Sequence, residues 1–212
     1  MIAERFRPWA LMALALAMFV PLFVTGGLPG FDFWWWMTTN ALVLVSLACF
    51  SDKKYIDILR EDLSQNAWKK IGMGLAAAVL LYFVFAAGNY LAQMFPFAKS
   101  GIAGVYGLKH GISSARIGFL MLLVIGPGEE ILWRGYFQRV FSTAYAPFIG
   151  LVIATFFYVA MHIASMNIML VVAAAVCGGF WGLLYLKYRS VLLNVVSHTA
   201  WDIAVFLLFP FS

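Results

Sequence analysis

Seven long runs of apolar residues, separated by shorter polar segments, dominate the chain. They are Trp9 to Thr25, Phe33 to Phe50, Ile71 to Phe95, Ile117 to Val140, Phe148 to Ala164, Ile168 to Leu186 and Val191 to Phe209. A helix that crosses a hydrocarbon core of about 30 Å uses about 20 residues, whereas a membrane β-strand uses about 10 and alternates apolar with polar positions. Because the runs are long and do not alternate, they predict an all-α, polytopic membrane helical bundle with about seven transmembrane helices.

The composition agrees with a membrane protein. Of the 212 residues, 64% are hydrophobic and 11% are charged, and the mean hydropathy is +0.92. Soluble domains contain about 25% charged residues. We therefore expect a single membrane domain, in which residues 1–116 supply N-terminal helices and loops and residues 117–212 form the core that carries the chemistry. This composition excludes nucleic-acid modules, Rossmann enzymes and disulfide scaffolds, so the expected surroundings are a lipid bilayer and no nucleic acid.

The basic residues are distributed unevenly among the polar segments. Lys and Arg accumulate on the cytoplasmic side of membrane proteins. With the N-terminus inside, eleven of the fourteen lie on the inner side, and only Lys99, Lys109 and Arg116 lie outside. The sequence therefore predicts an N-in, C-out orientation. The first run follows Arg5 and Arg7, as a secretory signal would, but its length and the lack of a clear cleavage site favour a retained anchor.

Two longer polar segments separate the runs. Residues 51–70 mix acidic and basic side chains, which predicts a cytoplasmic linker with an interfacial helical portion and no assigned chemistry. The segment around His110, between the third and fourth runs, contains Gly and Lys and is expected to be an outer loop.

Five ionisable side chains interrupt the apolar runs. They are Glu129 and Glu130 in the fourth run, His162 in the fifth, and His198 and Asp202 in the seventh. Each costs several kcal/mol at membrane depth unless it is paired, protonated or hydrated. Five such groups on three predicted helices exceed what helix packing requires, so we expect them to converge on one hydrated pocket.

The two glutamates follow an unusual local sequence, Gly126-Pro127-Gly128. Proline removes a backbone donor and glycine weakens a helix, so the fourth helix is expected to be kinked or broken here. Glu130 precedes Arg134 by four residues, which is the spacing of an intrahelical ion pair. Adjacent residues point about 100° apart on a helix. Glu129 is therefore the freer carboxylate, and it suits the role of general base.

The histidines also belong to one-turn pairs. His198 and Asp202 are four residues apart and form a polar patch on one face of an apolar helix. His162 follows Tyr158 at the same spacing, so the aromatic ring is expected either to pack against the imidazole or to wall the cavity.

Three motifs occur in order on separate apolar runs: Glu129-Glu130-x-x-x-Arg134, Tyr158-x-x-x-His162 and His198-x-x-x-Asp202. Together they resemble the motifs of the CPBP or Abi family, which comprises the Rce1-type CAAX proteases and the bacteriocin-processing and self-immunity membrane proteases. The resemblance covers about a dozen positions between residues 126 and 202. This chain has Tyr where the second motif usually has Phe, and Asp where the third often has Asn. Neither change removes a proton-transfer group.

The resemblance implies intramembrane hydrolysis of a peptide bond near the terminus of a membrane-associated or lipidated substrate. Glu129 is then expected to activate water and later to return the proton to the leaving amine. His162 and His198 are expected to orient the water and stabilise the oxyanion. Asp202 would support His198, and Arg134 would hold Glu130.

The sequence leaves the cofactor and the class of protein open. A metal-free glutamate mechanism is preferred, and the alternative is a zinc ion held by His162, His198 and a carboxylate. A proton- or ion-coupled transporter and a non-catalytic immunity or binding protein are the other classes considered. The expected location is a bacterial plasma (inner) membrane. The cavity is expected to open towards the cytoplasm, because Glu129 lies only about 15 Å along its helix from the inner edge.

Overall fold

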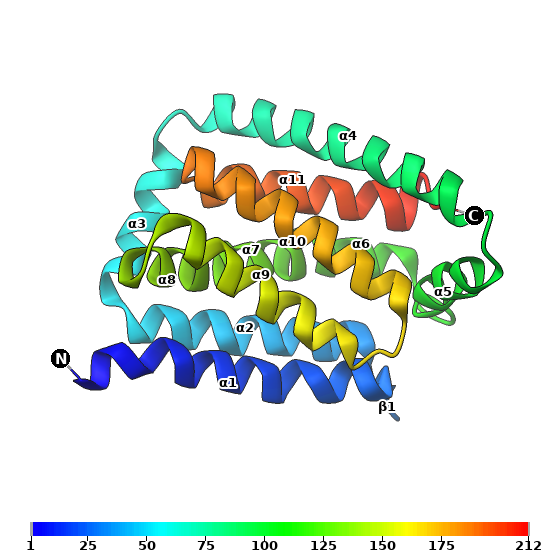
Figure 1. Ribbon diagram of the computed structural model, residues 1–212, viewed down its shortest axis with the longest axis horizontal. Coiled ribbons are helices and arrows are strands. Elements are labelled where there is room, and N and C mark those ends of the chain that lie inside the picture. The colour runs from blue at the N-terminus through cyan, green and yellow to red at the C-terminus, as the bar shows by residue number, and fades with distance from the viewer. Residues whose placement is uncertain (1, 212) are drawn as a thin grey trace.

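The structure is a computed structural model that describes the backbone of residues 2–211 and the side chains of residues 7–211. The side chain of Arg5, which contributes to the predicted charge asymmetry, lies outside the described residues. The described chain is a bundle of helices with one short hairpin, formed by β1 (Gly27–Leu28) and β2 (Phe31–Asp32) (Figure 1). The predicted all-α fold class is confirmed.

All seven apolar runs are helical. The helices that correspond to them are α1 (Ile2–Thr25), α2 (Phe33–Ser51), α4 (Ala67–Ala92), the rod described below, α9 (Pro147–Ile163), α10 (Ile168–Tyr188) and α11 (Val191–Ile203), which continues as the π-helix η3 (Ala204–Leu208). Among the described residues, five helices are long and apolar enough to cross a membrane: α1, α2, α4, α10, and α11 with η3. Helix α9 is apolar but shorter. The exact number of crossings and the N-in, C-out orientation stay predictions.

The fourth run forms one continuous helical rod. It consists of α6 (Ser114–Leu120), the π-helix η1 (Met121–Ile125), α7 (Gly126–Glu130), the π-helix η2 (Ile131–Gln138) and α8 (Arg139–Ala144). The expected disruption at Pro127 takes the form of these π-helical segments and not of a break. The Gly126 amide donates to the Met121 carbonyl five residues earlier. This wider turn precedes the proline, which has no amide hydrogen to contribute.

Two glycines beside the proline allow close helix packing. A β-carbon at Gly126 would lie 2.6 Å from the Thr199 hydroxyl oxygen on α11. A β-carbon at Gly128 would lie 2.9 Å from the Ala41 side chain on α2. Only glycine fits at these positions without displacing a neighbour. The glutamates that follow are thereby held between α2 and α11.

The polar segments contain two further helices. Helix α3 (Lys53–Ser64) confirms the predicted helical portion of the linker. Helix α5 (Pro96–Gly107) lies between the third and fourth runs, where no helix was predicted. His110 lies in the turn that follows this helix, in agreement with the loop expected there. The Tyr106 hydroxyl donates to the Val205 carbonyl at 2.9 Å, and the Lys109 amine donates to the Phe206 carbonyl at 2.7 Å. These contacts with η3 are tertiary, which explains why the glycine-containing local sequence did not predict the helix.

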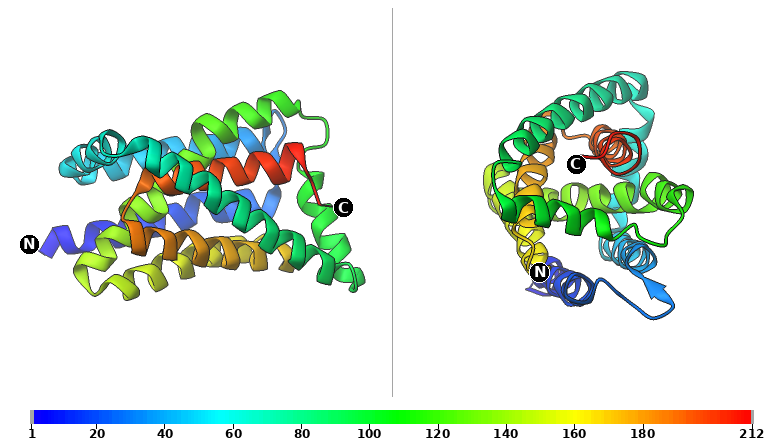
Figure 2. Two further views of the ribbon diagram at one scale, coloured as in Figure 1. Left: turned by 90° about the horizontal axis from the view of Figure 1, so that it is seen from above. Right: turned by 90° about the vertical axis from the view of Figure 1, so that its right-hand side faces the viewer.

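The bundle has two distinct ends (Figure 1). Helix α3 and the turn between α8 and α9 lie at one end, which we name the α3 end. Helix α5, the β1–β2 hairpin and the end of η3 lie at the other, which we name the α5 end. Viewed towards the α5 end, α5 runs across the bundle and the last helix lies inside the ring formed by the others (Figure 2, right). Helix α11 packs against α4 on one side and α7 on the other.

Candidate active site

A cavity of about 310 Å³ lies inside the bundle, and four of the five predicted ionisable residues line it. They are Glu129, His162, His198 and Asp202, and all four are buried. Glu130 is also buried but is not among the lining residues. The two adjacent glutamates therefore occupy different environments, as the angle between neighbouring helical positions predicts.

Glu130 is the centre of a buried network. Its Oε1 accepts from the Arg134 Nη1 at 2.7 Å and lies 2.8 Å from the His198 Nδ1. Its Oε2 accepts from the Asn194 amide at 3.1 Å. The predicted ion pair with Arg134 is present, and the glutamate side chain is 0% exposed. Glu130 therefore fixes the His198 ring in place as well as neutralising Arg134.

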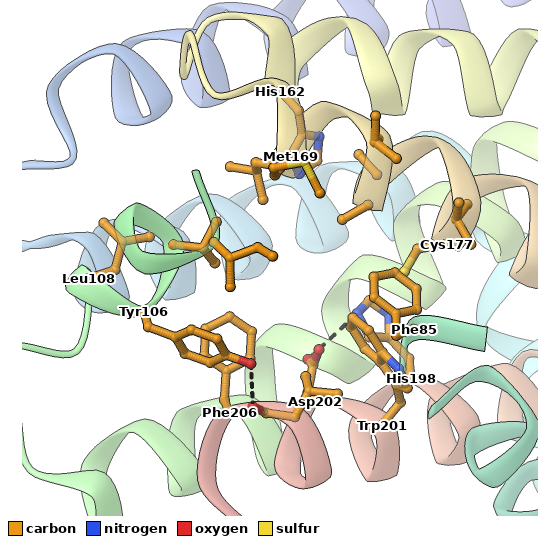
Figure 3. A pocket seen from close by; sticks show the side chains of 18 of the residues that line it. Phe85, Tyr106, Leu108, His162, Met169, Cys177, His198, Trp201, Asp202 and Phe206 are labelled. Carbon is orange, nitrogen blue, oxygen red and sulfur yellow. Dashed lines mark hydrogen bonds and ion pairs between the residues drawn. The ribbon is translucent and has the colours of Figure 1, made fainter. Parts of the chain in front are cut away.

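His198 is held so that one ring nitrogen faces the cavity. Its ring stacks on Trp181 with centroids 3.7 Å apart. Because ionised Glu130 can only accept, the hydrogen between them is on the His198 Nδ1. The Nε2 lies 3.5 Å from the Asp202 Oδ2 (Figure 3). It also lies 4.0 Å from the Glu129 Oε2. Nε2 is thus the ring nitrogen directed at the two carboxylates that line the cavity.

Glu129 is held by an aromatic hydroxyl. The Tyr158 hydroxyl donates to the Glu129 Oε2 at 3.0 Å. The Arg134 guanidinium lies over the Tyr158 ring, 4.9 Å from its centroid. Tyr158 therefore contacts both the Glu129 carboxylate in the cavity and Arg134 in the buried network. It also lines the cavity, which is one of the two roles expected from the sequence.

His162 lies on the opposite wall of the cavity from His198 and Asp202 (Figure 3). Its Nδ1 lies 2.7 Å from the Tyr158 carbonyl, and a carbonyl can only accept, so Nδ1 carries the hydrogen. The ring packs against Phe23, with centroids 4.5 Å apart. The structure thus brings Glu129, His198 and Asp202 together. His162 lies across the cavity from His198 and Asp202 and packs against the Tyr158 ring, with centroids 4.9 Å apart.

The donor set does not fit the zinc alternative. Among the described side chains, those of residues 7–211, no three His, Cys, Asp or Glu residues are placed to hold one metal ion. His162 faces the other imidazole across the cavity (Figure 3). Glu130 is already bonded to Arg134, Asn194 and His198. We therefore derive no step through a metal.

The cavity extends towards the α5 end of the bundle. Its lining includes Phe23 near the end of α1, Trp34 near the start of α2, Ile102 on α5 and Phe206 on η3. The cavity therefore opens away from the end near Arg139, from which the depth of Glu129 was counted. Because the orientation of the bundle stays a prediction, so does the expected opening towards the cytoplasm. The depth of Glu129 along its helix gave its distance from one edge but carried no information about the side on which the helices leave space.

Three residues of the site were not singled out from the sequence. Asn194 lies one turn before His198, so the four-residue spacing that linked His198 to Asp202 could have identified it. Trp181 gave no signal, because a tryptophan in an apolar run is ordinary. Tyr55 lies on α3, and its hydroxyl donates to the Ile131 carbonyl at 2.5 Å, immediately after Glu130. Burial raises the pKa of the Tyr55 phenol well above its usual value.

The Tyr55 contact leads to a stability prediction. Tyr55→Phe leaves the Ile131 carbonyl buried without its partner, so we expect the free energy of unfolding to fall by about 1–3 kcal/mol. Thermal unfolding in detergent measures the change. Tyr90→Phe is the matched control, because Tyr90 is 78% exposed on α4. Equal stability of the two variants would show that α3 does not support the helix that carries the glutamates.

One family model matches the chain. The model described as type II CAAX prenyl endopeptidase Rce1-like matches residues 111–204, which contain all three motifs. This confirms the family resemblance predicted from them. No curated protein and no solved structure matches the chain. The family match indicates a CAAX protease-type enzyme, and together with the five apolar helices it supports an integral membrane protein.

Proposed function

From the match of residues 111–204 to the Rce1-like family, we propose that this protein is an intramembrane endopeptidase. It hydrolyses a peptide bond near the terminus of a membrane-associated or lipidated polypeptide, in a bacterial plasma membrane. The observation that carries the proposal is the placement of Glu129. This buried carboxylate lines the cavity, 4.0 Å from the His198 Nε2 and 3.0 Å from the Tyr158 hydroxyl.

Glu129 acts as the general base. Its Oε2 already accepts from Tyr158, so the carboxylate is held in one orientation. It removes a proton from a water molecule in the cavity, and the hydroxide attacks the carbonyl carbon of the scissile bond. Proton abstraction at a fixed carboxylate contributes about 10²–10⁴-fold to the rate of such reactions.

His198 stabilises the negative charge that develops on the carbonyl oxygen. Its Nδ1 hydrogen is held by Glu130, which fixes the ring plane. When both ring nitrogens are protonated, the Nε2 hydrogen faces the cavity and donates to the oxyanion. Asp202 lies 3.5 Å from the same nitrogen, so it keeps the ring charged and oriented before substrate arrives.

Collapse of the tetrahedral intermediate completes the reaction. The carbon–nitrogen bond breaks, and the proton held by Glu129 passes to the leaving amine. The products are a carboxylic acid and a free amine, and Glu129 returns to its carboxylate form. His162, on the opposite wall, orients the water or the peptide through its unprotonated Nε2.

The mechanism uses no metal, which gives a direct prediction. A strong chelator removes bound metal ions from the purified protein. Because no step of the mechanism depends on a metal, the cleavage rate should change by less than about two-fold. Removal of a catalytic metal would instead abolish activity. Metal analysis of the same sample is the companion measurement. Stoichiometric zinc together with chelator-sensitive cleavage would contradict the proposed chemistry.

Substrate capture tests the proposed function. Glu129→Gln should retain substrates in native membranes long enough for cross-linking, since binding remains and hydrolysis stops. Captured polypeptides are then identified and offered to the wild-type protein in detergent. We expect the wild type to cut them at one position. Captured polypeptides that the wild type leaves intact would argue for a binding protein.

A further inference from the structure

We propose that Trp181 is a positioning residue for the reaction: its indole ring supports the face of the His198 imidazole and keeps Nε2 directed at the scissile carbonyl oxygen. The inference rests on the proposed endopeptidase function. It adds a residue of α10 to a site whose three sequence motifs lie on α7 with η2, on α9 and on α11. Trp181 lines the cavity and is 0% exposed.

The described hydrogen bonds hold the His198 ring at one edge. Its Nδ1 donates to the Glu130 Oε1 at 2.8 Å. At the other edge, Nε2 lies 3.5 Å from the Asp202 Oδ2 and 4.0 Å from the Glu129 Oε2. Both separations exceed the usual hydrogen-bond length of about 2.7–3.2 Å, so these carboxylates attract the protonated ring without fixing its tilt. Because the Cβ–Cγ torsion of histidine is broad, a contact with the ring face is needed to keep its plane.

Trp181 supplies this contact. The two ring centroids are 3.7 Å apart and the ring planes differ by 21°, so the rings are stacked almost parallel. At this separation a tilt of the imidazole drives its atoms into the indole. Indole is also the aromatic ring that attracts a cation most strongly, so the contact strengthens when the imidazole is protonated. The stack therefore keeps the plane that Glu130 sets while Nε2 donates to the oxyanion.

The indole is itself held in one orientation. Its Nε1 donates to the Ser197 hydroxyl on α11 at 3.2 Å, and the Trp181 carbonyl accepts from the Asn194 amide at 2.8 Å. Asn194 also donates to Glu130. The Arg134 guanidinium lies over the indole, 5.4 Å from its centroid. The support is therefore part of the buried network and is formed before substrate binds.

The kinetics of Trp181 variants test this role. The probe is a polypeptide captured by Glu129→Gln, and each purified variant cleaves it in detergent. Trp181→Leu should lower kcat per folded protein by about 10²-fold and leave KM unchanged, because a misplaced oxyanion donor weakens binding of the transition state alone. Trp181→Phe keeps an aromatic face and should stay within about five-fold of the wild type. If Trp181→Leu does not fold, Trp181→Met fills more of the space without a ring and carries the same expectation.

Two further measurements separate positioning from packing. Trp9→Leu is the matched control, because Trp9 packs against Phe141 with centroids 4.6 Å apart, and its loss should leave kcat per folded protein unchanged. The chain has three histidines, so their ring protons can be followed by NMR, and the signal absent from His198→Gln identifies His198. The stacked indole should shift this signal upfield, and Trp181→Leu should remove the shift.

Each competing explanation gives a different result. A rise in KM at constant kcat would show that Trp181 only contacts substrate, and equal losses of kcat in Trp181→Leu and Trp9→Leu would show that it only supports packing. Either result, or a His198 signal that Trp181→Leu does not move, overturns the positioning role. A wild type that leaves the captured polypeptide intact contradicts the endopeptidase function on which this role depends. An active wild type with unchanged kcat in Trp181→Leu overturns the role of Trp181 alone.

Discussion

Glu129→Gln is expected to reduce cleavage by about 10²–10⁴-fold, because an amide cannot remove a proton from water. The side chain keeps its shape, and its oxygen can still accept from the Tyr158 hydroxyl, so the fold should be preserved. The first-order cleavage rate of a captured substrate gives the effect on catalysis. Thermal unfolding in detergent shows whether the structure is retained.

Glu61→Gln is the matched control for this substitution. Glu61 is an exposed glutamate on α3, distant in sequence from the site, and its neutralisation should leave the cleavage rate unchanged. Cleavage by Glu129→Gln within about three-fold of the wild type would remove the general base from the account, since that role contributes at least about 10²-fold.

Glu130→Gln is expected to act in a different way, through stability. The substitution leaves the buried Arg134 guanidinium without a counter-charge, and loss of one partner of a buried pair costs about 3–5 kcal/mol. It also removes the carboxylate that accepts from the His198 Nδ1, so the remaining folded protein should be less active. Denaturant or thermal unfolding measures the first effect, and the cleavage rate normalised to folded protein measures the second.

A double variant separates the charge from the packing. Glu130→Leu combined with Arg134→Met removes both charges, so it should be more stable than Glu130→Gln while its cleavage rate stays low. If Glu130→Gln unfolds at the same free energy as the wild type, Glu130 is not the buried counter-charge that we infer from the 2.7 Å contact.

Much of the fold and the site was predictable from local sequence. The apolar runs gave all seven main helices, because a helix in lipid must satisfy its own backbone hydrogen bonds. The four-residue spacing of Glu130 and Arg134 gave the ion pair, and that of His198 and Asp202 gave two neighbours on one face. These features depend only on the geometry of a single helix, so the local sequence is sufficient to predict them.

The features that were missed depend on contacts between distant segments. Helix α5 owes its place to hydrogen bonds from Tyr106 and Lys109 to carbonyls of η3. The contact between Glu130 and His198 joins two helices 68 positions apart in the sequence, and no periodicity encodes it. The side on which the cavity opens depends in the same way on the packing of several helices, so the depth of Glu129 along its own helix does not predict it.

Cleavage of a captured substrate in ¹⁸O-labelled water is the most direct test of the claim that Glu129 activates water against a peptide bond. The purified wild-type protein should release two fragments, with one solvent oxygen in the new carboxyl group and none elsewhere. Glu129→Gln should release neither fragment under the same conditions. An intact substrate, together with ion flux through the same protein in liposomes, would contradict the account and indicate a transporter.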